Sequence, residues 1–147
     1  MLTPLTANAE IAIHLQAKHI TVNQRTGIST YTGNVRLRRG TLTFNAAKAI
    51  VTQRQHQIDT ITASGNPVVV KKKDSNNKLL TTITGQHIIY SARTNKIIIM
   101  GSVVTRQGLD EIQSTKISYD VSGDVIVAES KNGSARVSAV FHLTFSE

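Results

Sequence analysis

The side chains that most often perform catalysis or hold metals are few and scattered in this chain. Cysteine is absent from its 147 residues, which excludes thiolate catalysis, disulfide bonds and cysteine-based zinc sites. His14 and His19 would face opposite sides of a strand, as would the adjacent acids Asp110 and Glu111. The remaining histidines are His56, His87 and His142. No hydrolase, phosphate-loop or zinc-protease motif is present. We therefore expect no catalytic residue, no metal site and no cofactor, and we expect that the protein is not an enzyme.

Positive charge is the strongest chemical bias of the sequence. Lys and Arg total 17 against 9 Asp and Glu, which gives a formal charge of +8 and an isoelectric point of about 10.1. The basic residues cluster at Arg36, Arg38 and Arg39 and again at Lys71-Lys72-Lys73. Such clusters can bind phosphate, remain solvated, or guard sheet edges against aggregation. Nucleic acid is not an expected partner, because aromatic residues that stack on bases are only 4% of the chain and no nucleic-acid-binding motif appears.

The arginine cluster lies in a segment with the two-residue period of a β-strand. Val35 and Leu37 alternate with Arg36 and Arg38 before a turn at Arg39-Gly40. Residues two apart share a face of a strand, so one face of this hairpin is apolar and the other is basic. The apolar face can line an interior while the basic face stays in water.

The same pattern recurs along the chain in units of about 30 residues, which indicates stacked hairpins. Similar strands open at Lys18-His19-Ile20, Lys48-Ala49-Ile50, Gln86-His87-Ile88 and Thr115-Lys116-Ile117. Glycine motifs recur between them at Gly33-Asn34-Val35, Gly65-Asn66-Pro67 and Gly101-Ser102-Val103. No helical period is evident, and we predict roughly fourteen to sixteen short antiparallel strands.

The length and pattern predict one folded domain. We expect a flexible leader over residues 1–10 and a single domain over residues 11–147. No apolar run is long enough to span a bilayer, and the first six residues lack the blocks of a signal peptide. If the protein is exported, we expect this chain to be the mature form, from which the signal peptide is absent.

Six motifs in order resemble the OstA-like family of periplasmic lipopolysaccharide-transport proteins. They span the chain from about Ile11 to about Ala128 with consistent spacing: Ile13-His14-Leu15, Thr30-Tyr31-Thr32-Gly33-Asn34-Val35, Arg39-Gly40-Thr41-Leu42, Ala63-Ser64-Gly65-Asn66-Pro67, Ile88-Ile89-Tyr90 and Gly101-Ser102-Val103. Two acids that are usual in the family are replaced by Ala47 and Thr115, and an aromatic by Val70.

The resemblance implies an all-β fold, namely an elongated, twisted antiparallel β-jellyroll or β-taco that is partly open at both ends. Its apolar interior would carry the acyl chains of lipopolysaccharide. The expected lipid-binding residues are Ile13, Leu15, Val35, Leu37, Val70, Ile88 and Tyr90. The basic residues that could meet the phosphates of the headgroup are Arg36, Arg38, Lys71 and Lys72. Tyr90 is the most informative member of the wall, because a phenol in an apolar surface needs a hydrogen-bond partner.

The implied partners are lipopolysaccharide, through its lipid A, and transport components of the inner and outer membranes with related β-jellyroll domains. Open edges in the first strands and in the last alternating strand, Val137–Phe145, would also allow a head-to-tail homo-oligomer. The implied location is the periplasm.

Two other interpretations stay open. The apolar wall can be ordinary sheet core that meets no lipid, in which case the protein is a structural or adaptor module of the same fold that assembles edge to edge. A basic nucleic-acid-binding β-protein is the third and weakest interpretation.

Overall fold

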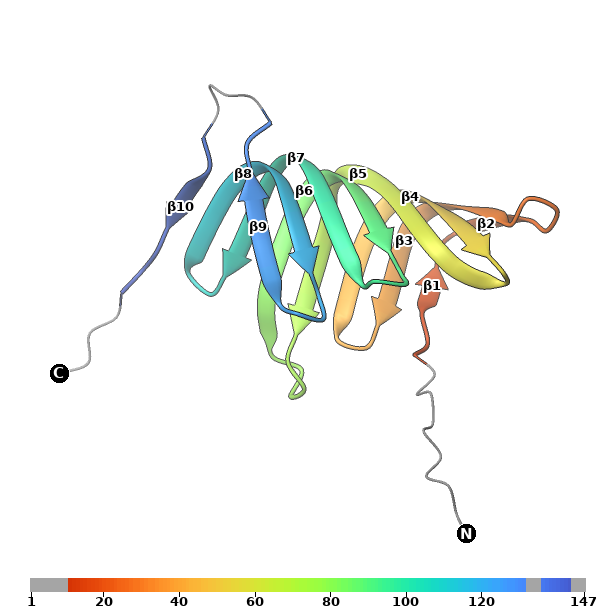
Figure 1. The fold of residues 1–147 in the computed structure, drawn as a ribbon, viewed down its shortest axis with the longest axis horizontal. Coiled ribbons are helices and arrows are strands. Elements are labelled where there is room, and N and C mark those ends of the chain that lie inside the picture. Colours follow the sequence, from red (N-terminus) through yellow and green to blue (C-terminus); the bar gives the residue numbers. More distant parts are fainter. Residues whose placement is uncertain (1–10, 132–135, 144–147) are drawn as a thin grey trace, which may run out of the picture.

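The computed structural model describes residues 11–131 and 136–143, and these form a single antiparallel sheet (Figure 1). Within the described residues the sheet has ten strands. Their bounds are β1 His14–Gln16, β2 His19–Asn23, β3 Ile28–Arg39, β4 Leu42–Arg54, β5 Gln57–Lys73, β6 Leu79–Ser91, β7 Lys96–Gln107, β8 Asp110–Asp120, β9 Val125–Glu129 and β10 Ser138–Val140. The expected leader lies outside the described residues.

The central strands are joined as consecutive hairpins, and the two outermost long strands each pair with two short ones. The order across the sheet is β1-β3-β4-β5-β6-β7-β8-β10, with β2 paired to the other end of β3 and β9 to the other end of β8. Each end of the sheet therefore carries two short edge strands. Of the last expected strand, Val137–Phe145, only Ser138–Val140 forms a strand; residues 141–143 are described but are not part of it, and residues 144 and 145 lie outside the described part.

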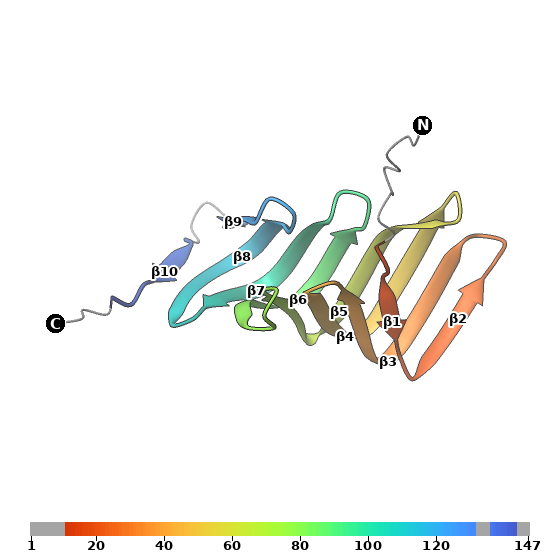
Figure 2. The same ribbon diagram turned by 90° about the horizontal axis from the view of Figure 1, so that it is seen from below.

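A line of register shifts divides the sheet into two halves. The shifts lie between Thr32 and Val35 in β3, and at matching places in the ladders between β4, β5, β6, β7 and β8. The strands bend over this line, which we call the ridge, and descend on both sides of it (Figures 1 and 2). We call residues 35–45, 68–85 and 103–114, with β1 and β10, the first half-sheet. Residues 28–32, 48–64, 87–100 and 116–120, with β2 and β9, form the second half-sheet.

The sequence repeats coincide with the ridge. In β3 and β7 the glycine motifs cross it with consecutive positive φ angles: Gly33 at 83° and Asn34 at 52°, then Gly101 at 89° and Ser102 at 46°. Left-handed residues of this kind insert a bulge that bends a strand without ending it. The prediction of fourteen to sixteen strands was therefore wrong, because each break in the alternation is a bend within one longer strand.

Thr115, one of the two residues found where the resemblance leads us to expect an acid, lies at the ridge and makes hydrogen bonds there. The hydroxyl of Thr115 accepts a hydrogen bond from the backbone N–H of Lys131 at 2.6 Å and donates to the carbonyl of Glu129 at 3.3 Å. This side chain thus connects the ridge to the chain that follows β9. No corresponding side-chain contact is possible at Ala47.

The core lies between the two half-sheets and is built from their inner faces. Its largest fully buried side chains are Tyr90, Tyr119, Phe44, Leu37, Leu42, Ile61, Ile83, Ile88, Ile97, Ile99, Ile117 and Val35. Phe44 of the first half-sheet meets Tyr90 of the second edge to face, with ring centroids 6.1 Å apart. The other side chains between the two half-sheets are almost all aliphatic, as the low aromatic content of the sequence requires.

Replacing Gly101 with alanine is expected to reduce the free energy of unfolding by about 1–3 kcal/mol, because of its left-handed φ and a close approach at the ridge. A Cβ at Gly101 would lie 2.5 Å from Oε1 of Gln86. Gly108→Ala is the matched control, since Gly108 also has positive φ but a Cβ there meets no atom within 4 Å. Urea denaturation measures both, and equal losses would contradict a steric role for Gly101.

Candidate functional site

The structure brings all seven residues of the expected lipid wall to one interior. Five of them, Val35, Leu37, Val70, Ile88 and Tyr90, are at most 1% exposed. Ile13 and Leu15 are half-buried and pack against the same core from the N-terminal edge. The alternation placed Val35 and Leu37 on the apolar face, and this is confirmed. Whether they bind lipid stays a prediction, and the side chains pack against one another in this conformation.

The inner face is uncovered at the N-terminal edge. Ile20 and Val22 of β2 pair with Tyr31 and Ser29, whose side chains lie on the inner side of the second half-sheet. Nevertheless Ile20 is 45% exposed and Val22 57% exposed. An apolar surface that faces inward but remains open marks the end of the sheet as a contact surface.

Three of the four expected headgroup residues share a hollow on the outer face. Arg36, Arg38 and Lys71 line a cavity of about 700 Å³ together with His14 and Lys73. No carboxylate lines it, and the one ion pair among the described residues, between Arg106 and Glu111, lies outside it. The sheet separates this outer hollow from the interior.

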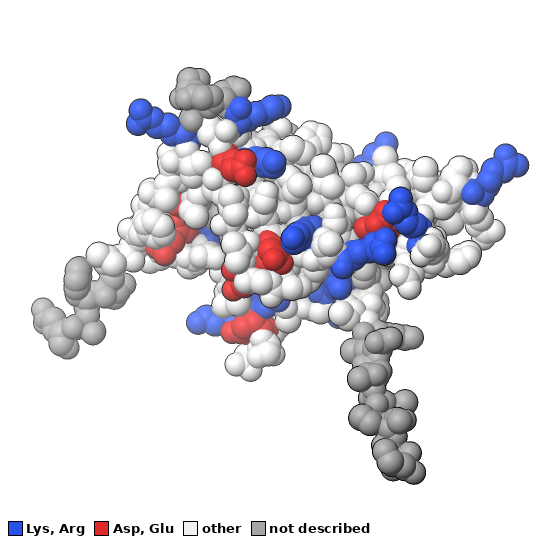
Figure 3. Space-filling model, in the orientation of Figure 1, with Lys and Arg blue, Asp and Glu red and all other residues white. Residues whose placement is uncertain are grey.

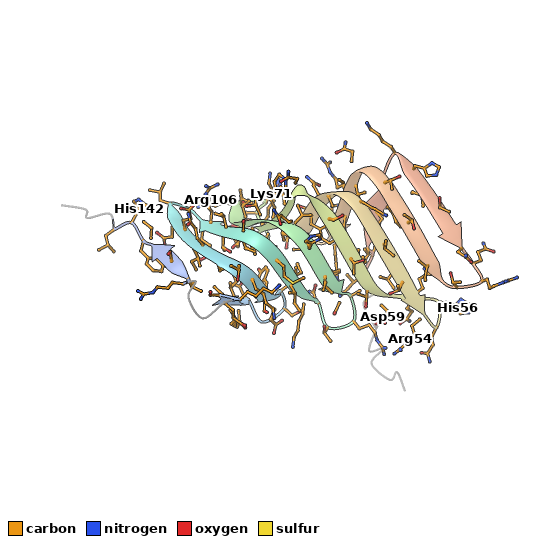
Figure 4. The ribbon with its side chains drawn as sticks, turned by 90° about the horizontal axis from the view of Figure 1, so that it is seen from above. Arg54, His56, Asp59, Lys71, Arg106 and His142 are labelled. Atoms are coloured by element: carbon orange, nitrogen blue, oxygen red, sulfur yellow. The ribbon has the colours of Figure 1, made fainter. Side chains whose placement is uncertain are left out.

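The charge of the outer hollow contrasts with that of the second half-sheet. On the face that carries β8 and β9, acidic and basic side chains are interspersed (Figure 3). Viewed from above, Lys71 and Arg106 lie along one long side of the molecule, and Arg54, His56 and Asp59 lie along the other (Figure 4). The outer hollow of the first half-sheet is thus lined by positive charge without a carboxylate.

Lys72 differs from its neighbours. Its pairing partners Leu42 and Thr81 are buried, so its side chain lies on the inner side of the first half-sheet. There its Nζ donates a hydrogen bond to the hydroxyl of Thr41. The run Lys71-Lys72-Lys73 is therefore divided between the two faces of β5, as the period of a strand requires.

A hydrogen-bonded clasp joins the free ends of the two half-sheets. Nη1 of Arg39, at the end of β3, donates to the Tyr90 hydroxyl at 2.8 Å and to the Ala92 carbonyl at 2.7 Å. The Tyr90 hydroxyl in turn donates to Oδ1 of Asn95 at 2.7 Å. We call these four residues the clasp and the opening that they cross the mouth. Among the described residues, Arg39 makes the only side-chain hydrogen bonds between the free ends of the half-sheets.

Sequence reasoning predicted a partner for the Tyr90 hydroxyl, and this is confirmed, but it did not identify Arg39. The signal was present, because Val35, Leu37 and Arg39 are two apart and share the inner face. The inward position of Arg39 was missed because Arg39 was grouped with Arg36 and Arg38, which face outward. Arg39 is half-buried rather than fully solvated.

A second buried tyrosine, Tyr119, also bonds to a side chain in the turn that follows its strand, as Tyr90 does to Asn95, but it has no arginine partner among the described residues. The Tyr119 hydroxyl donates to Oδ1 of Asp124 at 3.2 Å, the same five-residue offset that separates Tyr90 from Asn95. Asn95 and Asp124 both occupy left-handed turn positions, with φ of 55°. Burial raises the pKa of Tyr90, and burial together with the Asp124 carboxylate raises the pKa of Tyr119 to about 12.

The described residues hold no group of three histidine, cysteine or acidic side chains that could bind a metal ion. The described part of the chain also contains no helix that could cross a membrane.

Comparison with known proteins identifies the family. Residues 14–125 match the family described as LptA/(LptD N-terminal domain) LPS transport protein. The chain belongs to this family. LptH, the lipopolysaccharide export system protein of Pseudomonas aeruginosa, is 23% identical over 135 residues, which cover 91% of this chain and 77% of LptH. LptA, the corresponding export protein of Escherichia coli K12, is 25% identical over 131 residues, or 88% of this chain and 70% of LptA.

The fold is shared as well. The crystal structure of P. aeruginosa LptH, the LptA-homologous periplasmic component of that organism's lipopolysaccharide transport device, aligns with a TM-score of 0.80 at 21% identity. The alignment covers 90% of this chain and 96% of that structure. The predicted all-β antiparallel jellyroll is confirmed. The family consists of transport proteins, which agrees with the prediction that the chain is not an enzyme.

Tyr119 is expected to make stability fall at high pH. Its pKa in the folded state is about 12, above the ordinary value of 10.0, so its contribution is complete below pH 10 and is lost as the pH rises towards 12. Between pH 9 and 12 the wild type should lose on the order of 1–2 kcal/mol more unfolding free energy than Tyr119→Phe. Chemical denaturation at each pH measures this, with lysine titration common to both proteins. Parallel curves would contradict it.

Proposed function

We propose that the protein is a periplasmic bridge that binds lipopolysaccharide without covalent chemistry and shields its acyl chains between the two half-sheets. It passes the lipid from inner-membrane to outer-membrane transport complexes whose components carry related β-jellyroll domains. The observation that carries the proposal is the continuous aliphatic interior between the half-sheets, in a family of lipopolysaccharide transport proteins. The periplasmic location of the related LptH supports the same location for this chain.

The energetics of an acyl chain support an enclosed carrier. Exposing about a dozen methylenes to water costs on the order of 10 kcal/mol, at roughly 0.8 kcal/mol each. The lipid wall proposed here consists of Ile13, Leu15, Val35, Leu37, Val70, Ile88 and Tyr90. Because five of these are at most 1% exposed, chains reach them only when the half-sheets separate. Contacts between the wall and the methylenes of the acyl chains then replace the contacts that the aliphatic side chains make with one another.

The outer hollow supplies a proposed contact for the headgroup. Arg36, Arg38 and Lys71 lie together there without acidic partners, so phosphate groups that pass around the free end of the first half-sheet are attracted to them. Lys72 reaches the same free end from the inner side, beside Thr41.

The ends of the sheet supply the proposed joints with partners and with further copies of the chain. β1 and β2 border one end of the sheet, and β9 and β10 border the other. Unpaired edges accept further strands, so head-to-tail assembly extends the interior from one molecule to the next.

The alternative is an adaptor module that assembles through these edges without binding lipid. The observation in its favour is the packing of the interior, where the wall residues already bury one another.

Site-specific photo-cross-linking separates the two. A photoreactive residue at Leu15, which packs against the core, is expected to form adducts with added lipopolysaccharide, whereas one at the exposed Thr62, on the outer face of β5 and away from the outer hollow, is not. Ile88 and His87 provide a second inward and outward pair on β6. Folding of every variant is checked by circular dichroism. Absence of adducts at both inner positions of a folded protein would favour the adaptor.

Val22→Lys is expected to oppose assembly, because it places a charge on the open apolar face of an edge strand. Light scattering over a concentration series should show growing particles for the wild type and monomers for the variant. Leu109→Lys is the control, since Leu109 is also an exposed apolar residue but lies in the turn between β7 and β8. A wild type that remains monomeric at high concentration would contradict head-to-tail assembly.

A further inference from the structure

A cavity of about 580 Å³ lies at the mouth, beside the clasp. Its lining includes Arg39 and Ala92 of the clasp, Arg93 from the turn after β6, Ile58 of the second half-sheet and residues 11–13, which precede β1. The mouth side is the one seen in Figure 2, where the molecule is viewed from below. The cavity therefore lies where a lipid would have to pass between the free ends of the half-sheets.

The lining combines positive charge with an apolar wall. Arg39 and Arg93 line the cavity together with Ile11, Ile13 and Ile58, and no carboxylate lines it. Asp59 is nearby, but it meets Ala92 through its backbone carbonyl. Arg93 is exposed and makes no hydrogen bond or ion pair to any described residue. Ile13 and Ile58 also pack against the core, so the apolar wall of the cavity continues into the interior.

The partners of Arg39 are weak ones for a guanidinium. Both are neutral oxygens, the Tyr90 hydroxyl and the Ala92 carbonyl. A phosphate offers charged oxygens in a geometry that a guanidinium binds with two parallel hydrogen bonds, and such bonds are roughly twice as strong as neutral ones. A phosphate placed in the cavity would therefore compete successfully for Arg39.

We propose that Arg39 and Arg93 form a phosphate-binding site at the mouth, which takes the phosphorylated headgroup of a lipid and releases the clasp. The site rests on the function proposed above and assigns its recognition step. Phosphate draws Arg39 away from Tyr90 and Ala92, which removes the hydrogen bonds that join the free ends of the half-sheets. The acyl chains then pass along Ile13 and Ile58 into the interior. Phosphate recognition and opening are thus one event.

The first experiment measures the preference for phosphate. Wild-type protein is offered phosphorylated lipid A and chemically dephosphorylated lipid A of the same acyl composition in competition, and native mass spectrometry counts the two complexes. The wild type is expected to prefer the phosphorylated form about tenfold. Arg39→Gln and Arg93→Gln should each reduce this preference at least about threefold, and Arg39→Lys, which keeps the charge but cannot make the two parallel hydrogen bonds, should retain only part of it.

The neighbouring arginines make the test specific. Arg38 adjoins Arg39 but lines the outer hollow on the opposite face of β3. Loss of the preference in Arg38→Gln alone would assign the phosphate to the outer hollow and overturn the mouth site. Arg25→Gln, in the exposed turn between β2 and β3, is the control for total charge. Arg93→Gln keeps the test valid if Arg39→Gln unfolds, because Arg93 is exposed.

The second experiment measures opening. Spin labels at Asn76→Cys and Thr94→Cys, on exposed turns at the free ends of the two half-sheets, report the width of the mouth, and the chain has no other cysteine. Phosphorylated lipid A should lengthen the distance, and dephosphorylated lipid A at equal concentration should lengthen it less. In Arg39→Gln the distance should be longer and broader before lipid is added.

The outcomes separate this inference from the proposed function. A wild type that binds both lipids equally, with equal opening, overturns the phosphate site but leaves lipid binding intact. A folded wild type that binds neither overturns the proposed function and the phosphate site with it.

Discussion

The contact between the two aliphatic inner faces is the interaction on which the rest of the structure depends. In the described residues no helix covers the sheet, so each half-sheet is the only cover for the other. Apolar burial is non-directional and depends on area more than on exact fit. A wall made chiefly of Ile, Leu and Val can therefore exchange its own side-chain contacts for contacts with methylenes, which a wall of interlocking aromatic rings would do less readily.

The interior is held together differently along its length. Near the N-terminal edge the clasp adds hydrogen bonds across the mouth to the apolar contact. Towards the C-terminal edge, Tyr119 is bonded only within its own half-sheet, and the buried hydroxyls of Thr105 and Ser114 have no partner among the described residues. Unpaired buried hydroxyls weaken a contact. The half-sheets are thus more firmly joined near the N-terminal edge than towards the C-terminal edge.

The sequence predicted which face each residue occupies, because the two-residue period of a strand is local information. Val35 and Leu37 were assigned correctly in this way. The position of the bend was not predicted, because Gly33-Asn34 and Gly101-Ser102 interrupt the alternation as the end of a strand would until their long-range pairing is known. The closed state of the interior and the position of Arg39 depend on contacts between residues more than 50 positions apart, which no local pattern contains.

The placement of the sequence repeat at the ridge has a consequence for how such a molecule changes size. Each repeat is one hairpin with its own bend, and neighbouring strands in a sheet are about 4.8 Å apart, so one repeat adds about 10 Å along the ridge. Duplication or loss of a single hairpin would lengthen or shorten the enclosed path by that step without altering its cross-section. The length of the enclosed path therefore depends on the number of hairpins, whereas its width does not. The two dimensions can evolve separately.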